Sequence, residues 1–270
     1  MKSLPSVSAL AIGIALAAPA LANDRHFAYL YETAVLPPGG RELEVSTTFR
    51  TGRDDFYSRL DQRLEFEVGL TEKVMTAFYL NWSNTTSEVS TDVLGSQFAW
   101  QGVSSEWKWK LSDPVADPVG FALYGELGYA TDAIELEAKT LFDKKVGKIL
   151  WAANLVAEGE FEAEPDEYEL EEIELEADFG ASYAVSPHLS VGLELRNHNE
   201  IAKVAGSEEM EFEHSALFFG PNVSYATESW WMTFSILPQL PALMKAGDGG
   251  ILVLDEHEKI NARLLFSFHI

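Results

Sequence analysis

Apolar and charged side chains alternate one by one along much of this chain, most regularly between Glu172 and Phe179. The apolar positions of that segment are Ile173, Leu175, Ala177 and Phe179, and the carboxylates are Glu172, Glu174, Glu176 and Asp178. Successive side chains of a β-strand point to opposite faces. The alternation therefore predicts a strand with one apolar face and one strongly anionic face.

The same alternation recurs along the rest of the chain. It predicts strands at about residues 41–51, 56–70, 73–84, 96–111, 119–131, 133–143, 147–161, 168–186, 188–199, 211–225, 229–237 and 257–270. Because no helical segment is present to cover the apolar faces, lipid is the expected cover, and only a closed barrel can span a membrane with strands. We therefore predict an all-β protein, an antiparallel transmembrane β-barrel of about 12 strands of the outer-membrane type.

A soluble β-sandwich is the alternative fold, and it would have shorter strands with turn signals every ~8–12 residues. The connections favour the barrel. Alternate ones are tight and rich in turn-forming residues, as periplasmic turns are. These are Thr71–Lys73, Ser112–Pro118, Asp143–Gly147, Ser186–His188 and Ala226–Ser229. The longer outer loops are expected at Thr85–Gly95, Glu162–Glu167, Glu200–Glu209 and Pro238–Glu256.

Tryptophans lie mostly near the predicted strand ends, where the aromatic girdles of membrane barrels are found. They are Trp82, Trp100, Trp107, Trp109, Trp151, Trp230 and Trp231. We expect them to face the lipid interface.

The first residues have the parts of an export signal: Lys2, an apolar run from Ala9 to Ala18, and an Ala-x-Ala sequence ending at Ala22. We therefore predict a cleaved signal peptide at residues 1–22 and a location in the outer membrane. Residues 23–39 form an aromatic segment that is either a periplasmic lead-in or a plug inside the barrel. The barrel itself is assigned to residues 40–270.

The formal net charge is −24 at pH 7, and removal of residues 1–22 would make it one unit more negative. Like charge repels, so the balance argues against nucleic acid as a partner. Cysteine is absent, which excludes disulfides and thiolate metal sites. The expected partners are outer-membrane lipid and lipopolysaccharide, small solutes, and the barrel-assembly machinery, which would read the alternation of Phe266, Phe268 and Ile270 in the last strand.

Three segments carry a resemblance to a known group of proteins. They run from Tyr31 to Glu44, from Leu64 to Thr71, and from Gly147 to Leu155. In these segments the chain resembles exported outer-membrane barrels of the phenol-degradation-pathway (MetA-type) or transporter-like family, many of unknown function. The resemblance covers most of the mature chain and rests on strand and turn motifs. It implies an outer-membrane barrel that admits small organic compounds, and it implies no catalytic residues.

The charged faces belong inside the barrel, because each Arg or Lys facing lipid at the midplane would cost roughly 2–4 kcal/mol. The candidate lumen-lining residues are Arg59, Asp61, Arg63, Glu65, Glu67, Glu106, Lys108, Glu126, Glu158, Glu172, Glu174, Glu176, Asp178, Glu194, Arg196 and Arg263. Their anionic excess predicts a channel or transporter for small solutes that prefers cations. The alternative is a structural or surface-interaction barrel whose lumen is plugged by paired charges.

No metal site, cofactor or enzymatic activity is predicted. Two clusters combine carboxylates with histidine, at Glu208–His214 and at Asp255–Glu258. Acidic loops of this kind are commonly solvated, although oxygen-rich loops can hold Ca²⁺ or Mg²⁺. A lipid hydrolase would need an activated serine. Ser267 and His269 share a strand face, but no Gly-x-Ser-x-Gly setting is present.

Overall fold

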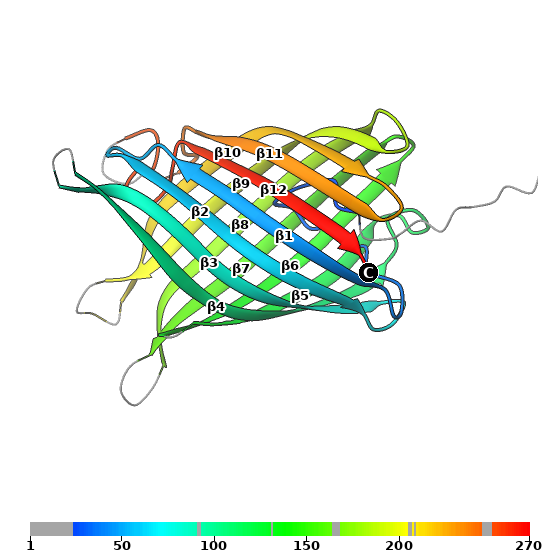
Figure 1. Cartoon of the computed structure of the whole chain (residues 1–270), viewed down its shortest axis with the longest axis horizontal. Coiled ribbons are helices and arrows are strands. Elements are labelled where there is room, and N and C mark those ends of the chain that lie inside the picture. The colour runs from blue at the N-terminus through cyan, green and yellow to red at the C-terminus, as the bar shows by residue number, and fades with distance from the viewer. Residues whose placement is uncertain are drawn as a thin grey trace, which may run out of the picture.

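The computed structural model describes residues 24–90, 93–130, 132–163, 168–204, 207, 209–244 and 250–270. These residues form twelve strands (Figure 1). The strands are β1 (Arg41–Thr51), β2 (Tyr57–Gly69), β3 (Val74–Ser90), β4 (Val93–Ser112), β5 (Gly120–Tyr129), β6 (Ala133–Val146), β7 (Ile149–Ala163), β8 (Tyr168–Ala184), β9 (Leu189–Lys203), β10 (Met210–Ala226), β11 (Trp230–Leu240) and β12 (Ile260–His269).

Each strand pairs antiparallel with its neighbours in sequence, and β1 pairs with β12 to close the sheet. In the closing register Glu42 lies opposite His269 and Thr51 lies opposite Ile260. Closure satisfies every strand edge, which is the condition for strands to cross a bilayer. The predicted fold class, an antiparallel transmembrane barrel of twelve strands, is confirmed.

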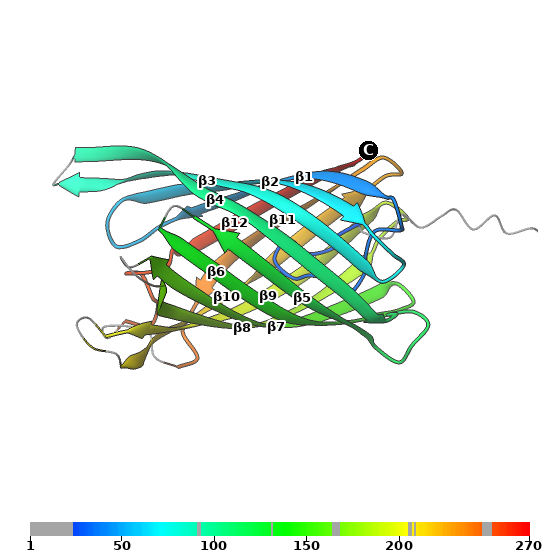
Figure 2. The same cartoon turned by 90° about the horizontal axis from the view of Figure 1, so that it is seen from below.

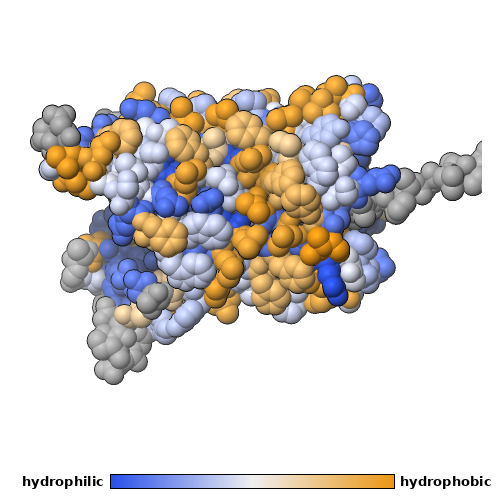
Figure 3. All heavy atoms as spheres, viewed as in Figure 1, coloured by the Kyte–Doolittle hydropathy of each residue, from blue (hydrophilic) through white to orange (hydrophobic). Residues whose placement is uncertain are grey.

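The alternation of the sequence becomes an outside and an inside. On β4 the outward Trp107 and Trp109 are both 53% exposed. The alternating Glu106 and Lys108 point inward and are 1% and 4% exposed. On β2 the outward Phe66 is 37% exposed, and its neighbours Glu65 and Glu67 are buried. Apolar side chains consequently spread over the outer wall, as the face in Figure 3 shows. In a membrane this wall is covered by hydrocarbon.

The two rims differ from expectation in several places. The predicted turn Asp143–Gly147 is mostly strand, because β6 continues to Val146, and β9 continues to Lys203 into the predicted outer loop Glu200–Glu209. The predicted outer loop Thr85–Gly95 is wrong, because β3 continues to Ser90 and β4 begins at Val93. The pairing of β2 with β3 ends at Ser87 and the pairing of β4 with β5 ends at Val103, whereas β3 and β4 stay paired with each other as far as Ser90 and Val93. They form a hairpin that extends past the neighbouring strands (Figure 2). This segment has fewer charged side chains alternating with apolar ones than the other strands have, which is why its sequence predicts a loop.

The expected lipid-facing position is also wrong for one tryptophan. Trp231 is 1% exposed and donates its Nε1–H to Glu42 Oε2 inside the barrel at 3.0 Å. Trp82 lies beside a β-bulge whose extra residue, Gln101, is on β4, and its Nε1–H donates to Gln62 at 2.8 Å. A bulge shifts the alternation of its own strand by one residue, so Trp100 of β4, which is 50% exposed, shares the outer face with its partner Trp82.

Residues 24–36 lie inside the barrel, where Figures 1 and 2 show them behind the wall in dark blue. The segment leaves through a turn at Pro37–Gly40, in which Gly39 has a φ of +79°. This backbone conformation favours glycine. Gly39 N then donates to Gly69 O and Gly69 N donates to Gly40 O, so the turn is fixed to the rim at the end of β2.

Among the described residues there is no helix of the length and apolar character needed to cross a bilayer.

The lipid-facing wall makes a direct prediction about stability. Leu80 on β3 is 44% exposed and lies opposite Leu64 and Val103 in the register. We expect Leu80→Arg to reduce the free energy of unfolding from lipid vesicles by about 2–4 kcal/mol, because a cation would enter the hydrocarbon. Leu94→Arg, on the extended hairpin, is the matched control and should cost less than about 1 kcal/mol. Urea titrations in vesicles measure both, and equal costs would contradict a hydrocarbon cover confined to the barrel wall.

Candidate functional site

The segment of residues 24–36, which we name the plug, is attached to the barrel wall through one carboxylate above all. Glu194 of β9 is fully buried and accepts the backbone N–H groups of Ala28 at 2.9 Å and Tyr29 at 2.8 Å. Asn222 and Ser235 of the neighbouring strands also donate to this carboxylate. Hydrogen bonds to a charged acceptor are about twice as strong as neutral ones. The plug backbone is therefore held by an ion that would be costly to bury without these donors.

Two further wall residues bind the backbone as the plug crosses the lumen. Asn154 of β7 accepts from Tyr31 N at 2.7 Å and donates to Tyr31 O at 2.9 Å. Asp143 of β6 accepts from Thr33 N at 2.9 Å and from Thr33 Oγ1 at 2.7 Å. Because the plug has no regular secondary structure, these side chains replace the hydrogen bonds that a helix or sheet would supply.

Apolar packing fixes the plug at a second set of points. Phe27 is fully buried with Leu30, Leu150 and Ala152. A Cβ at Gly180 would lie 2.6 Å from the Phe27 ring, so the absence of a side chain on β8 leaves the space that this ring fills. The plug therefore has a shape that matches the wall, in addition to hydrogen bonds.

The charged groups of the plug are tuned by their burial and by one another. Burial raises the pKa of Asp24 to about 6, and the nearby His269 partly opposes this shift. Burial disfavours a charged His26, but the Glu32 carboxylate, 3.1 Å from His26 Nδ1, outweighs burial and raises the pKa of His26 above its usual value. The two residues form an ion pair within the plug itself.

A cavity of about 330 Å³ lies on the outer side of the plug. Arg25, Tyr29 and Tyr31 of the plug form part of its lining. Arg25 and Tyr31 also line a pocket of only about 10 Å³ beside Glu67 and Lys108. These two plug residues thus stand between the large cavity and the narrow space toward the other rim.

Carboxylates follow one register row across six neighbouring strands of the wall. The row runs through Glu106, Glu126, Glu137, Glu158, Glu174 and Glu200, each directly opposite the next. Like charges directly opposite one another are destabilising. Such a row is stable only if its charge is neutralised, by side-chain cations, by ions from the solution or by protons that neighbouring carboxylates hold.

Side-chain cations neutralise part of the row. Arg63 lies 3.4 Å from Glu126, and Lys139 lies 2.9 Å from Glu137. Among the described residues, no Arg or Lys lies within ion-pairing distance of Glu158.

Opposite this wall, β1, β2 and β12 carry a cationic group made up of Arg50, Arg59, Arg63 and Arg263. Within this group, Asp61 pairs with Arg50 at 2.9 Å and with Arg59 at 2.5 Å. The cavity thus has an acidic wall facing a basic one.

A family profile described as a family of unknown function, DUF6662, matches residues 19–270. The chain belongs to the DUF6662 family. No curated protein matches this chain. The family match does not name the phenol-degradation-pathway proteins, so that resemblance stays a prediction.

Solved structures place this DUF6662 chain among porin-like barrels by fold. The NanC porin has a TM-score of 0.54 at 9% identity, over 84% of this chain and 100% of the porin. The translocator domain of autotransporter NalP from Neisseria meningitidis has a TM-score of 0.46 at 9% identity, over 86% of this chain and 88% of that domain. At these identities the likeness to NanC shows a shared barrel fold and nothing about what passes through it.

The structure brings most of the sequence-predicted lumen residues of the DUF6662 chain to one cavity. Those that line it are Arg59, Asp61, Arg63, Glu65, Glu126, Glu158, Glu174, Glu176, Asp178, Arg196 and Arg263. Glu67 and Lys108 lie at the small pocket, Glu106 accepts from Tyr79, and Glu194 binds the plug. Glu172 precedes the cavity-lining Glu174 by two residues on β8 and does not itself line the cavity.

Several residues of the site are not among the predicted ones. Arg50, Glu135, Glu137 and Lys139 line the cavity, and all four lie on inward positions of alternating strands. The periodicity could have found them. Asn154 and Asp143 could not have been found in this way. They bind the backbone of the plug, and the path of the plug has no periodic signal in the sequence.

Ser267 and His269 do not form a hydrolase site. Ser267 Oγ donates to Glu42 Oε2 at 2.8 Å, and His269 Nδ1 lies 3.0 Å from Glu42 Oε1. The carboxylate stands between the hydroxyl and the imidazole, whereas an activated serine needs the imidazole beside it.

The attachment of the plug can be tested at Glu194. We expect Glu194→Ala to speed hydrogen exchange of the Ala28 and Tyr29 amides by about tenfold or more, because each loses a bond to a charged acceptor. Glu228→Ala, in an exposed turn, is the control and should leave both amides unchanged. Equal protection in the two variants would mean that Glu194 does not hold the plug.

Proposed function

We propose that this protein is an outer-membrane channel for small solutes, with a cation-preferring lumen and a plug that must move for passage. The apolar outer wall and the barrel fold shared with the NanC porin support a place in the outer membrane. The charged cavity of about 330 Å³ carries the proposal, because an internal space lined by charged groups can hold water and concentrate small ions.

Cation preference is supported by the balance of charges around the cavity. Ten carboxylates and seven Arg or Lys side chains line it, so its formal charge is negative. Fixed charges of one sign at the wall raise the local concentration of the opposite ion. The basic wall opposite the carboxylate row also suits a zwitterion, whose two charged ends could face the two walls.

The plug would control entry to the periplasmic side. It meets the wall through polar side chains as well as apolar ones, and such a contact can be exchanged for water more readily than a purely apolar one. Passage of a solute beyond Arg25 and Tyr31 requires the plug to rearrange. A barrel plugged permanently, with a structural or surface-interaction role, is the competing function.

The remaining partners are part of the same proposal. Outer-membrane lipid and lipopolysaccharide would surround the apolar wall. The barrel-assembly machinery would read the last strand, whose Phe268 and Ile270 are 44% and 67% exposed.

A reversible cross-link tests whether the plug moves. The chain has no cysteine, so Thr33→Cys with Asp143→Cys, which replaces a contact of 2.7 Å, would introduce a single pair. We expect oxidation to abolish conductance in planar bilayers and reduction to restore it. Each single-cysteine variant under the same oxidant is the control. Conductance that is insensitive to oxidation would show that solutes bypass the plug, and silence in both states would favour the permanently plugged barrel.

Charge selectivity is tested separately by two matched neutralisations. We expect Glu126→Gln to shift the reversal potential in a KCl gradient toward that of Cl⁻, because the carboxylate row loses a charge that Arg63, 3.4 Å away, stabilises, and this cation is left unpaired. Arg59→Gln should shift it toward K⁺. Equal potentials for both variants and the wild type would contradict a selectivity set by this cavity.

A further inference from the structure

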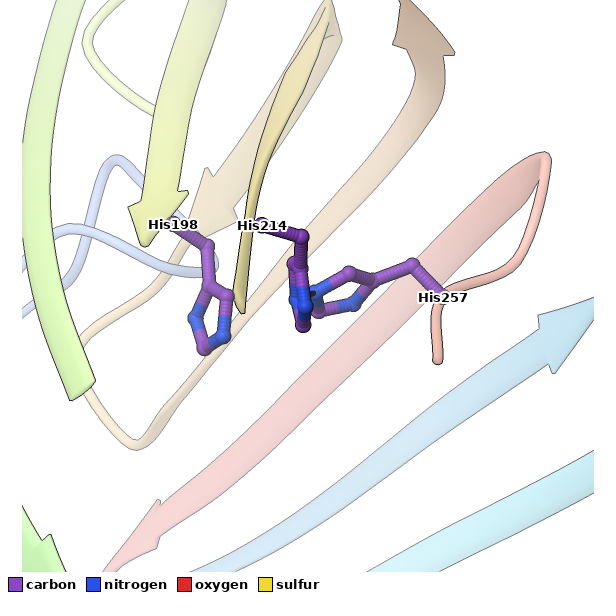
Figure 4. A group of neighbouring side chains, drawn as sticks. All are labelled: His198, His214 and His257. Carbon is purple, nitrogen blue, oxygen red and sulfur yellow. Dashed lines mark hydrogen bonds between the residues drawn. The ribbon is translucent and has the colours of Figure 1, made fainter. Parts of the chain in front are cut away.

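Three histidines that are far apart in the sequence meet at the outer end of the carboxylate row. His198 lies on β9, His214 lies on β10, and His257 lies in the connection between β11 and β12 (Figure 4). His214 lies directly opposite Glu200, the last member of the row. One ring nitrogen of each histidine lies within 4.8 Å of the others. Both acidic clusters noted in the sequence contribute a histidine here, although Glu208 of the first lies outside the described residues.

The separations within this group are close to those of a metal site. His214 Nε2 and His257 Nε2 are 2.8 Å apart, and the His257 ring centroid lies 4.6 Å from that of His198. A tetrahedral Zn²⁺ with bonds of 2.0–2.1 Å requires its nitrogens to be about 3.3 Å apart. One nitrogen pair is closer than this value at 2.8 Å and the other two pairs are at most 4.8 Å apart, so small movements of the rings would accommodate an ion.

His198 is already oriented as metal-binding histidines are. Its Nδ1 lies 2.9 Å from Glu176 Oε1, and a carboxylate on one ring nitrogen fixes the tautomer that leaves the other nitrogen as a ligand. That other nitrogen, Nε2, is buried and has no hydrogen-bond partner, in a side chain that is 93% buried. Buried polar atoms without partners are rare, and a bound ion would account for this one.

We propose that His198, His214 and His257 bind a divalent transition-metal ion of the Zn²⁺ class. Imidazole nitrogens suit this class, whereas Ca²⁺ and Mg²⁺ take oxygen ligands. Glu200 Oε2, 3.5 Å from His214 Nε2, is placed to supply a fourth ligand.

Binding would also fix the β11–β12 connection against the inside of the wall. That connection is already turned inward, since Val253 N donates to Gln239 Oε1 at 2.7 Å and the buried Glu258 pairs with Arg53 at 3.2 Å. His257 is the only one of the three histidines that the connection supplies. The ion would therefore join the connection to β9 and β10 beside the cavity, where Glu174 and Glu176 line the wall.

The test measures binding of Zn²⁺ to the whole barrel in detergent after treatment with a chelator. We expect one Zn²⁺ per chain by calorimetry and by elemental analysis. His257→Ala should weaken binding by more than the roughly 10–100-fold that loss of an outer-shell partner costs. His188→Ala, in an exposed turn at the other rim, is the matched control and should bind as the wild type does. Heat-modifiable gel migration verifies that each variant is folded.

Hydrogen exchange distinguishes a metal ligand from a merely structural histidine. We expect Zn²⁺ to protect residues 250–259 in the wild type, and to have no effect on them in His214→Ala, whose substitution is on β10. Absence of Zn²⁺ binding, or binding that survives His257→Ala and His214→Ala, would overturn the proposal. Preference for Ca²⁺ over Zn²⁺ would overturn it as well, since oxygen ligands alone would then form the site.

Discussion

The structure depends on one constraint: a closed sheet whose outer face meets hydrocarbon must place all its charges on the inner face. The cavity of this DUF6662 chain is lined by ten carboxylates and seven Arg or Lys side chains, so its basic side chains do not balance its carboxylates one for one. The carboxylate row from Glu106 to Glu200 is the result of placing alternating strands in register. Both the cavity and the attachment of the plug follow from how this excess charge is stabilised.

The barrel wall stabilises its buried carboxylates in two ways. Glu194 and Asp143 accept backbone N–H groups of the plug, and their charge is thus satisfied without a cation. Glu126 and Glu137 instead pair with Arg63 and Lys139. The first kind fixes a segment of chain in the lumen, and the second kind leaves an open space between charged walls. The position of the cavity on the outer side of the plug reflects this division.

The barrel could be predicted from the sequence because its signal is periodic. Each strand presents one face to lipid and one to the lumen, and a period of two is visible without knowing the partner strands. The prediction was wrong at Trp231, where an aromatic ring faces inward and donates a hydrogen bond to Glu42. The meeting of His198 with His257 could not be predicted, because it depends on how a long connection folds inward and on which strands are neighbours around the barrel.

The histidines and the carboxylate row are best understood together. An imidazole that bonds to Glu176 and a second that lies opposite Glu200 are both in the field of the same anionic wall. That field favours any cation, but only nitrogen donors distinguish a transition-metal ion from K⁺ or Mg²⁺. The row without the histidines would therefore attract cations without discrimination, whereas the histidines at its outer end add a chemical selectivity that the carboxylates lack. Because one of the three belongs to a connection rather than to the wall, an ion bound there would join that connection to β9 and β10.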